Sequence, residues 1–165
     1  MDAAAKDQMV ARAYSLGYEY EQKFHNCPQC VLATIQEVLG LVDDAVFKAA
    51  HSLAGGGGIT GMGTCGALVG GMLAVGSRHG RAREDFGRGR YMESYRRAKS
   101  LYDRFVQEYG SPICGDVQRK LFGRRYDLWE EYDAFEAAGA HVDRCPTVVG
   151  RTAAWTVEVL LDEGE

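Results

Sequence analysis

Four of the chain's five cysteines each lie at the expected start of a different helix. They are Cys27, Cys65, Cys114 and Cys145. Cys27 follows an asparagine and precedes a proline, and Cys145 also precedes a proline; both features are typical of helix starts. Thr64 is the expected cap of the helix at Cys65, and the serine–proline pair at 111–112 places Cys114 in a first turn.

This placement favours reactive or metal-binding thiolates. A helix N-terminus exposes unpaired N–H groups and carries a partial positive charge, so we expect lowered cysteine pKa values. Four converging helix starts would present four sulfurs together with N–H donors. Such a site suits an iron–sulfur cluster, whose negative charge the donors would stabilise. Zinc is the second choice, because zinc sites usually take ligands in close pairs and only one close cysteine pair is present.

The fifth cysteine, Cys30, forms a CxxC motif with Cys27. At a helix start this motif can exchange disulfides, with Cys27 as the attacking thiolate and Cys30 as the resolving thiol. No βαβ pattern accompanies the motif, which argues against a thioredoxin-like fold. A c-type haem site is excluded, because Val31 stands where that motif requires histidine. A thiol–disulfide oxidoreductase using Cys27 with Cys30 or Cys65 is therefore an alternative, and whether the protein is an enzyme stays open.

Inert packing is a third interpretation of the cysteines. The apolar residues that follow at helical spacing put the cysteines on apolar helix faces, and free cysteine is often buried in cores. On this interpretation the protein is a non-catalytic helical interaction module. The three interpretations differ in whether the helix ends meet in space and whether the thiols react there.

A glycine-rich stretch at residues 55–66 contains Cys65. Gly61, Gly63 and Gly66 match a dinucleotide-binding fingerprint by their letters, but that fingerprint must follow a strand and the preceding residues predict a helix. We therefore interpret the stretch as a loop of close backbone approach. The N–H groups of these glycines are expected to lie near the sulfur of Cys65 or near a bound cluster.

Two histidines lie close to cysteines in the sequence. His25 comes two residues before Cys27, and His141 comes four residues before Cys145. We interpret both as ordinary surface side chains. The alternative is that either one tunes a thiolate or replaces a cysteine as a metal ligand.

Apolar residues recur at three- or four-residue spacing along nearly the whole chain, and strand alternation is absent. Helices are predicted over residues 5–23, 27–39, 43–54, 65–79, 91–109, from 111 onward, 127–138 and 146–161. An aromatic stripe in the fifth of these is assigned to the core; it consists of Tyr91, Tyr95, Ala98, Tyr102, Phe105 and Tyr109. The prediction is an all-α fold, a compact bundle of about six to eight helices in a single domain over residues 1–165.

Composition excludes several classes of partner. With 165 residues, 46% of them hydrophobic, the chain can build one full core, and its net charge of −4 argues against nucleic-acid binding. Neither a signal peptide nor an apolar run of bilayer length is seen, so we expect a cytoplasmic protein with no membrane partner. The expected partner is an unidentified redox protein. The aromatic stripe and a small-residue helix are also candidate faces for a homodimer.

The order of these motifs resembles the C-GCAxxG-C-C family of redox-active proteins. The matching residues are the Cys27–Cys30 run, the Cys65–Gly71 block after the glycine loop, Cys114, and the Cys145–Pro146 pair. The resemblance covers residues 24–161 and implies a small helical domain with an iron–sulfur or thiol redox role. It places the family's cysteines on Cys27, Cys65, Cys114 and Cys145. Cys30 departs from the pattern, which usually has serine or alanine there, and residues 123–142 are longer than the resemblance leads one to expect.

Overall fold

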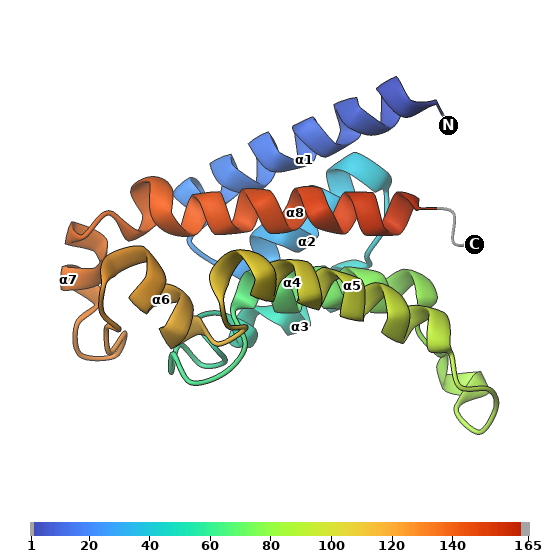
Figure 1. The fold of residues 1–165 in the computed structure, drawn as a ribbon. Coiled ribbons are helices and arrows are strands. Elements are labelled where there is room, and N and C mark those ends of the chain that lie inside the picture. Colours follow the sequence, from blue (N-terminus) through green and yellow to red (C-terminus); the bar gives the residue numbers. More distant parts are fainter. Residues whose placement is uncertain (1, 163–165) are drawn as a thin grey trace.

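Eight α-helices, two short 3₁₀ turns and one π-helical turn make up most of residues 2–162, the part that the computed structural model describes (Figure 1). In chain order they are α1 (Ala3–Phe24), α2 (Cys27–Leu39), α3 (Asp44–Ala49), η1 (Ala50–Leu53), α4 (Gly66–His79), η2 (Arg83–Asp85), α5 (Met92–Tyr109), α6 (Cys114–Phe122), α7 (Tyr132–Ala137), the π-helical η3 (Ala140–Arg144) and α8 (Cys145–Leu161). Extended pairing within this part is limited to one isolated bridge, between Thr64 and Ile113. The predicted all-α bundle is confirmed. No helix in residues 2–162 has both the length and the apolar character of a membrane span.

Local capping signals explain where the first two helices begin and end. The Asp2 side chain accepts a hydrogen bond from the N–H of Ala5 (2.7 Å) at the start of α1. Asn26 does the same for the N–H of Gln29 (3.3 Å) at the start of α2. Gly40, with φ at 65°, ends α2 in the left-handed conformation that glycine adopts without strain. The asparagine–cysteine–proline signal therefore starts a helix as predicted, and Cys27 is its first residue.

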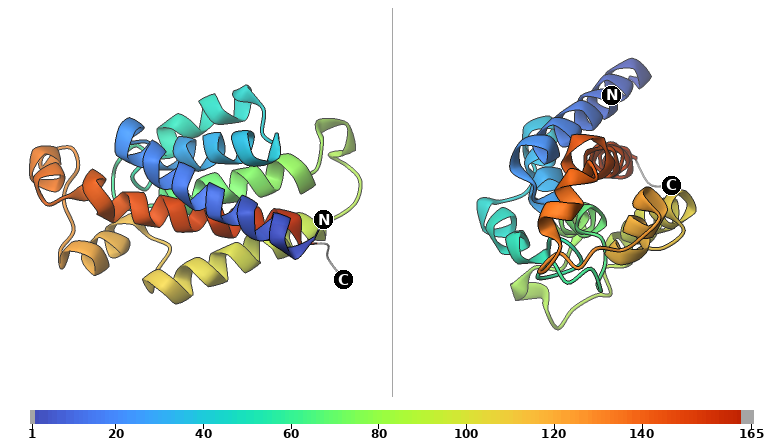
Figure 2. Two further views of the ribbon diagram at one scale, coloured as in Figure 1. Left: turned by 90° about the horizontal axis from the view of Figure 1, so that it is seen from above. Right: turned by 90° about the vertical axis from the view of Figure 1, so that its left-hand side faces the viewer.

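Helices α1 and α8 pack along one another through small residues (Figures 1 and 2). A Cβ added to Gly17 on α1 would lie 3.1 Å from the Cβ of Ala153 and 3.3 Å from the Cα of Gly150. A Cβ on Gly150 would lie 2.8 Å from the carbonyl oxygen of Tyr14. The two backbones therefore approach closely because neither helix has a side chain at the crossing. This contact places the end of α1 beside the turn η3 that precedes α8.

Helix α4 crosses the centre of the bundle and is also rich in small residues. A Cβ on Gly70 would lie 2.7 Å from the carbonyl oxygen of Pro28 on α2. A Cβ on Gly71 would lie 2.6 Å from both the Leu101 side chain of α5 and the Thr156 hydroxyl of α8. The small residues of α4 thus hold α2, α5 and α8 against a common centre, and the first turn of α4 comes to lie beside that of α2.

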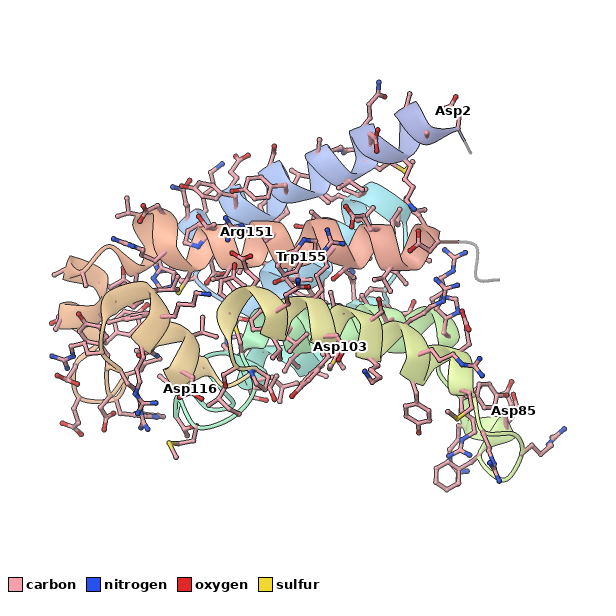
Figure 3. The ribbon with its side chains drawn as sticks, in the orientation of Figure 1. Asp2, Asp85, Asp103, Asp116, Arg151 and Trp155 are labelled. Carbon is pink, nitrogen blue, oxygen red and sulfur yellow. The ribbon has the colours of Figure 1, made fainter. Side chains whose placement is uncertain are left out.

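The aromatic stripe of α5 is only partly in the core. Phe105 and Tyr109 are buried, as predicted, but Tyr95 and Tyr102 are exposed, and Leu101 takes the buried position between them. Leu101, Phe105 and Tyr109 recur every four residues, so the buried face of α5 centres on them and leaves Tyr95 and Tyr102 at its edge. Trp155 of α8 (Figure 3) lies against α5, where the Arg104 guanidinium lies over its ring.

The predicted starts of α4, α6 and α7 were too early by one to five residues. The cap of α4 is Cys65 itself, not Thr64. Helix α6 begins at Cys114, not at Ser111, whose hydroxyl instead accepts a hydrogen bond from the N–H of Ile113 (3.1 Å). The segment from Asp127 begins with a turn and becomes helical only at Tyr132. The first two corrections bring the cysteines closer to the helix ends than the sequence indicated.

Two glycines of α4 test the close-packing account. Gly70→Ala is expected to destabilise the protein by about 1–3 kcal/mol, because the added methyl group would meet the Pro28 backbone. Gly76→Ala in the same helix has nothing within 4 Å of the added Cβ and is expected to stabilise by about 0.5–1 kcal/mol. Urea denaturation of the two variants measures both changes. Equal effects of the two substitutions would contradict the packing described here.

Candidate redox site

The four cysteines at helix starts line one cavity. Cys27, Cys65, Cys114 and Cys145 come from the beginnings of α2, α4, α6 and α8, and they share a cavity of about 80 Å³. Cys65 is buried, and the other three keep partial exposure. The cavity lies at the end of the bundle that α6 and α7 close (Figure 1). Residues separated by more than a hundred positions in the chain therefore meet at one place.

Backbone hydrogen bonds place Cys65 beside Cys114. The N–H of Cys65 donates to the carbonyl oxygen of Pro112 (2.7 Å), and the N–H of Cys114 donates to the carbonyl oxygen of Gly63 (2.9 Å). These two bonds join the end of the glycine loop to the segment that leads into α6. Because each bond uses the amide of a cysteine, the positions of both sulfurs depend directly on this pairing.

The glycine loop needs its glycines for backbone conformation. Residues 55–58 are four consecutive glycines with φ between 55° and 81°, a region that favours glycine. A Cβ on Gly63 would lie 2.4 Å from the carbonyl oxygen of Gly56. The N–H groups of Gly61 and Gly63 donate to carbonyl oxygens within the loop, at 2.8 and 3.0 Å. These two amides are therefore already engaged, and the prediction that they face a sulfur or a cluster is not supported.

Gly66 has a different role from the other loop glycines. It is the first residue of α4, where an amide N–H has no partner within the helix. A Cβ at this position would lie 2.3 Å from the Sγ of Cys27 and 2.7 Å from the Cδ of Pro28. The absence of a side chain at Gly66 thus makes the room that the Cys27 sulfur occupies.

Cys145 does not lie at a free helix start. The π-helical turn η3 leads directly into α8, and the N–H of Cys145 donates to the carbonyl oxygen of Ala140. The prediction of an open N-terminus at this cysteine was wrong, because helical backbone continues through it. The positive helix end that the sequence indicated is thus absent at Cys145.

The pKa values of the cavity thiols are raised, whereas the sequence predicts lowered values. Burial raises the pKa values of Cys27 and Cys145 well above the ordinary range, and the nearby Glu21 carboxylate adds to the effect. Burial and the neighbouring Cys114 raise the pKa of Cys65 to about 12, although the amides of Ala67 and Leu68 act to lower it. Burial raises the pKa of Cys114 less strongly, with Gln118 and Arg125 opposing the change. Helix amides are present as expected, but desolvation and like charges outweigh them.

Glu21 is a buried carboxylate that sequence reasoning missed. Its side chain is only 2% exposed and lines the same cavity as the cysteines. One of its oxygens, Oε2, has no hydrogen-bond partner. Glu21 follows Ala13 and Gly17 at four-residue spacing on the buried face of α1. An acidic residue in line with small residues was the sequence signal that could have indicated a buried carboxylate.

The surface interpretation of the histidines holds for His25 and is wrong for His141. The side chain of His141 is 8% exposed, and that of His25 is 41% exposed. Burial acts to lower the pKa of His141, but the carboxylates of Glu21 and Glu136 outweigh it and raise that pKa. The two imidazole rings stack with centroids 4.0 Å apart, and both line the cavity.

The long segment at residues 123–142 closes one side of the cavity. Leu128, Tyr132 and Phe135 contribute apolar surface to its wall. The segment is attached to the glycine loop, since Trp129 donates from Nε1 to the carbonyl oxygen of Gly58 (3.0 Å). The segment therefore covers one side of the space that the sulfurs border.

Cys30 lies apart from the other four cysteines. It is 2% exposed, packs in the main core and does not line the shared cavity. Burial raises its pKa, and Glu21 adds to the effect. The CxxC motif thus places one thiol in the cavity and the other in the core.

The raised pKa values predict slow alkylation of the reduced, metal-free protein. Each unit of raised pKa lowers the thiolate fraction about tenfold, so iodoacetamide at pH 8 should label Cys27, Cys65 and Cys145 at least tenfold more slowly than in urea. Peptide mass spectrometry over time gives the rate for each cysteine, with the urea-unfolded protein as the reference. Labelling as fast in the folded protein would show that the helix amides dominate after all.

Comparison with known proteins agrees with this arrangement. The sequence profile of the family described as "Putative redox-active protein (C_GCAxxG_C_C)" matches residues 25–159. No curated protein and no solved structure is significantly similar to the chain. The match begins just before Cys27 and ends within α8, so it includes every cysteine that lines the cavity. The chain therefore belongs to the C_GCAxxG_C_C family.

Proposed function

We propose that this protein transfers electrons or senses redox state through an iron–sulfur cluster held by Cys27, Cys65, Cys114 and Cys145. The observation that carries the proposal is the convergence of these four thiols on one cavity with largely apolar walls. Four cysteine ligands are the usual set for such clusters. When bound, a cluster would supply a one-electron couple shielded from water.

The spacing of the sulfurs favours a cluster over a single zinc ion. Four sulfurs around one zinc ion lie about 3.8 Å apart, given Zn–S bonds of about 2.3 Å. Within residues 2–162, no three cysteine sulfurs lie within 4.8 Å of one another. The four sulfurs are therefore not gathered closely enough for one zinc ion, which leaves zinc as the second choice for this site.

The cavity walls offer specific support to a sulfur-bound group. Nε2 of Gln118 lies 3.6 Å from the Sγ of Cys114, and Arg125 contributes positive charge near the same sulfur. Hydrogen bonds and charge near the sulfurs are among the factors that set a cluster's reduction potential. Bound metal would also remove the penalty of the raised thiol pKa values, because a coordinating thiol is deprotonated by the ion.

The geometry gives less support to the two other functions. Thiol–disulfide exchange by Cys27 with Cys30 or Cys65 requires an accessible resolving thiol, and both Cys30 and Cys65 are buried. Inert packing describes Cys30 well, and Cys65 also belongs to the main core, but the four other cysteines all border one internal space. A cytoplasmic location and an electron-exchanging partner protein belong to this proposal, because reduced thiols and a redox partner are what such a cluster needs.

Anaerobic reconstitution with iron and sulfide tests the proposal. We expect a brown protein that contains iron and acid-labile sulfide and absorbs visible light. Cys65→Ala should lose most of the bound iron, because Cys65 is the most buried ligand of the set. Metal and sulfide analysis together with the absorption spectrum measure these changes.

Cys30→Ala provides the matched control, since it removes a buried thiol outside the cavity. This variant should keep the full iron and sulfide content. Colourless, iron-free wild-type protein after reconstitution would reject the cluster, and equal iron loss in both variants would reject the assignment of its ligands.

A further inference from the structure

A second group of metal-ligating side chains lies beside the cysteines and is not used by them. It consists of His25 at the end of α1, Glu136 on α7 and His141 on η3. Figure 1 shows the end of α1, α7 and the start of α8, which η3 precedes, at one end of the bundle. One ligand atom from each residue lies within 4.8 Å of the others. We propose that His25, Glu136 and His141 bind a divalent transition-metal ion of the zinc or iron(II) kind.

His141 is already oriented as a metal-bound histidine would be. Its Nδ1 is hydrogen-bonded to Oε1 of Glu136, and its Nε2 lies 3.5 Å from Oε1 of Glu21 on the other edge of the ring. Metal-ligating histidines commonly direct their second ring N–H to a carboxylate, which fixes the tautomer and the ring orientation. Glu21 is therefore the positioning residue at Nε2, and an ion bound at Nδ1 would take the place of the proton shared between His141 and Glu136.

Glu21 supplies the independent observation that a cation belongs here. Its side chain is 2% exposed, and its Oε2 has no hydrogen-bond partner. A buried carboxylate with an unsatisfied oxygen is costly unless positive charge lies nearby. A divalent ion between His141, Glu136 and His25 would place positive charge beside this carboxylate.

The backbone is unusual at both histidines. His25 ends α1 with φ at 56°, a left-handed conformation uncommon outside glycine, and His141 lies in a π-helical turn. Single π-helical turns occur frequently at functional sites, because the wider turn redirects a side chain. Here the two features bring the imidazole rings into a parallel stack 4.0 Å apart.

Ion binding requires one change from this stack. Ring nitrogens coordinate in the plane of the ring, so two parallel rings at 4.0 Å cannot both reach one ion at about 2.1 Å. His25 is the more exposed ring and can turn about its side-chain bonds, whereas His141 is held on both edges. The three residues leave further coordination positions to water or to another molecule, and the partly exposed Glu136 and His25 provide the entry path.

The nitrogen and oxygen ligands of this site can be distinguished from the cysteine ligands by spectroscopy. Imidazole and carboxylate suit zinc, iron(II) and cobalt(II), whereas thiolates add a sulfur-to-metal charge-transfer absorption that nitrogen and oxygen ligands lack. The proposal is therefore independent of what the four cysteines hold, and each site has its own spectroscopic signature.

Anaerobic cobalt(II) titration of the reduced full-length protein tests the site. We expect one cobalt ion to bind with visible ligand-field absorption and without sulfur charge transfer, apart from any cobalt bound by thiolates. His25→Asn and Glu136→Gln should weaken this sulfur-free binding at least tenfold. Asparagine is chosen because it tolerates the left-handed conformation at residue 25. Glu21→Gln should weaken binding about 10–100-fold, as loss of a carboxylate behind a ligating histidine typically does.

His51→Asn is the matched control, because His51 is exposed and lies outside the cavity. It should bind cobalt as the wild type does, and circular dichroism should show equal helix content in every variant. Wild-type protein that binds cobalt only with sulfur charge transfer, or not at all, would overturn the proposal. Unchanged sulfur-free binding in folded His25→Asn and Glu136→Gln would overturn it as well.

Discussion

The pairing of the glycine loop with the segment before α6 is the contact on which the site depends. It joins Cys65 to Pro112 and Gly63 to Cys114 through backbone hydrogen bonds, so two sulfurs from different helices are placed by the main chain itself. The run of glycines makes this approach feasible, because its backbone follows a path that side chains would block. Gly66 then gives the Cys27 sulfur its space. The small-residue contact between α1 and α8 brings the remaining wall of the cavity into place.

Burial makes negative charge unfavourable at the cysteines, and positive charge from a bound group would offset this effect. The same walls that shield the sulfurs from water raise the pKa values of the thiols. Glu21 adds a buried carboxylate at the edge of the same space. A site with this charge pattern is poorly suited to free thiolates and well suited to cations, because positive charge offsets both the desolvation and the mutual repulsion. This constraint links the cysteines to the histidine–glutamate group beside them.

Local patterns predicted most of the fold and much less of the site. Asn26 and Gly40 marked the ends of α2, since capping depends on a few neighbouring residues. The cysteines were identified by their positions, but their pKa directions were wrong because burial is a property of the whole fold. Nothing near Cys145 in the sequence revealed the π-helical turn that occupies its amide. The prediction of an exposed His141 was wrong, because its partner Glu21 is distant in the chain.

The central claim is that four cysteines from four helices form the ligand set of one redox group. Anomalous diffraction at the iron absorption edge, from crystals of the anaerobically reconstituted protein, tests this claim most directly. The account predicts iron density in the cavity between Cys27, Cys65, Cys114 and Cys145, within bonding distance of all four sulfurs. Absence of iron between these sulfurs, or iron bound by only some of these cysteines, would contradict it.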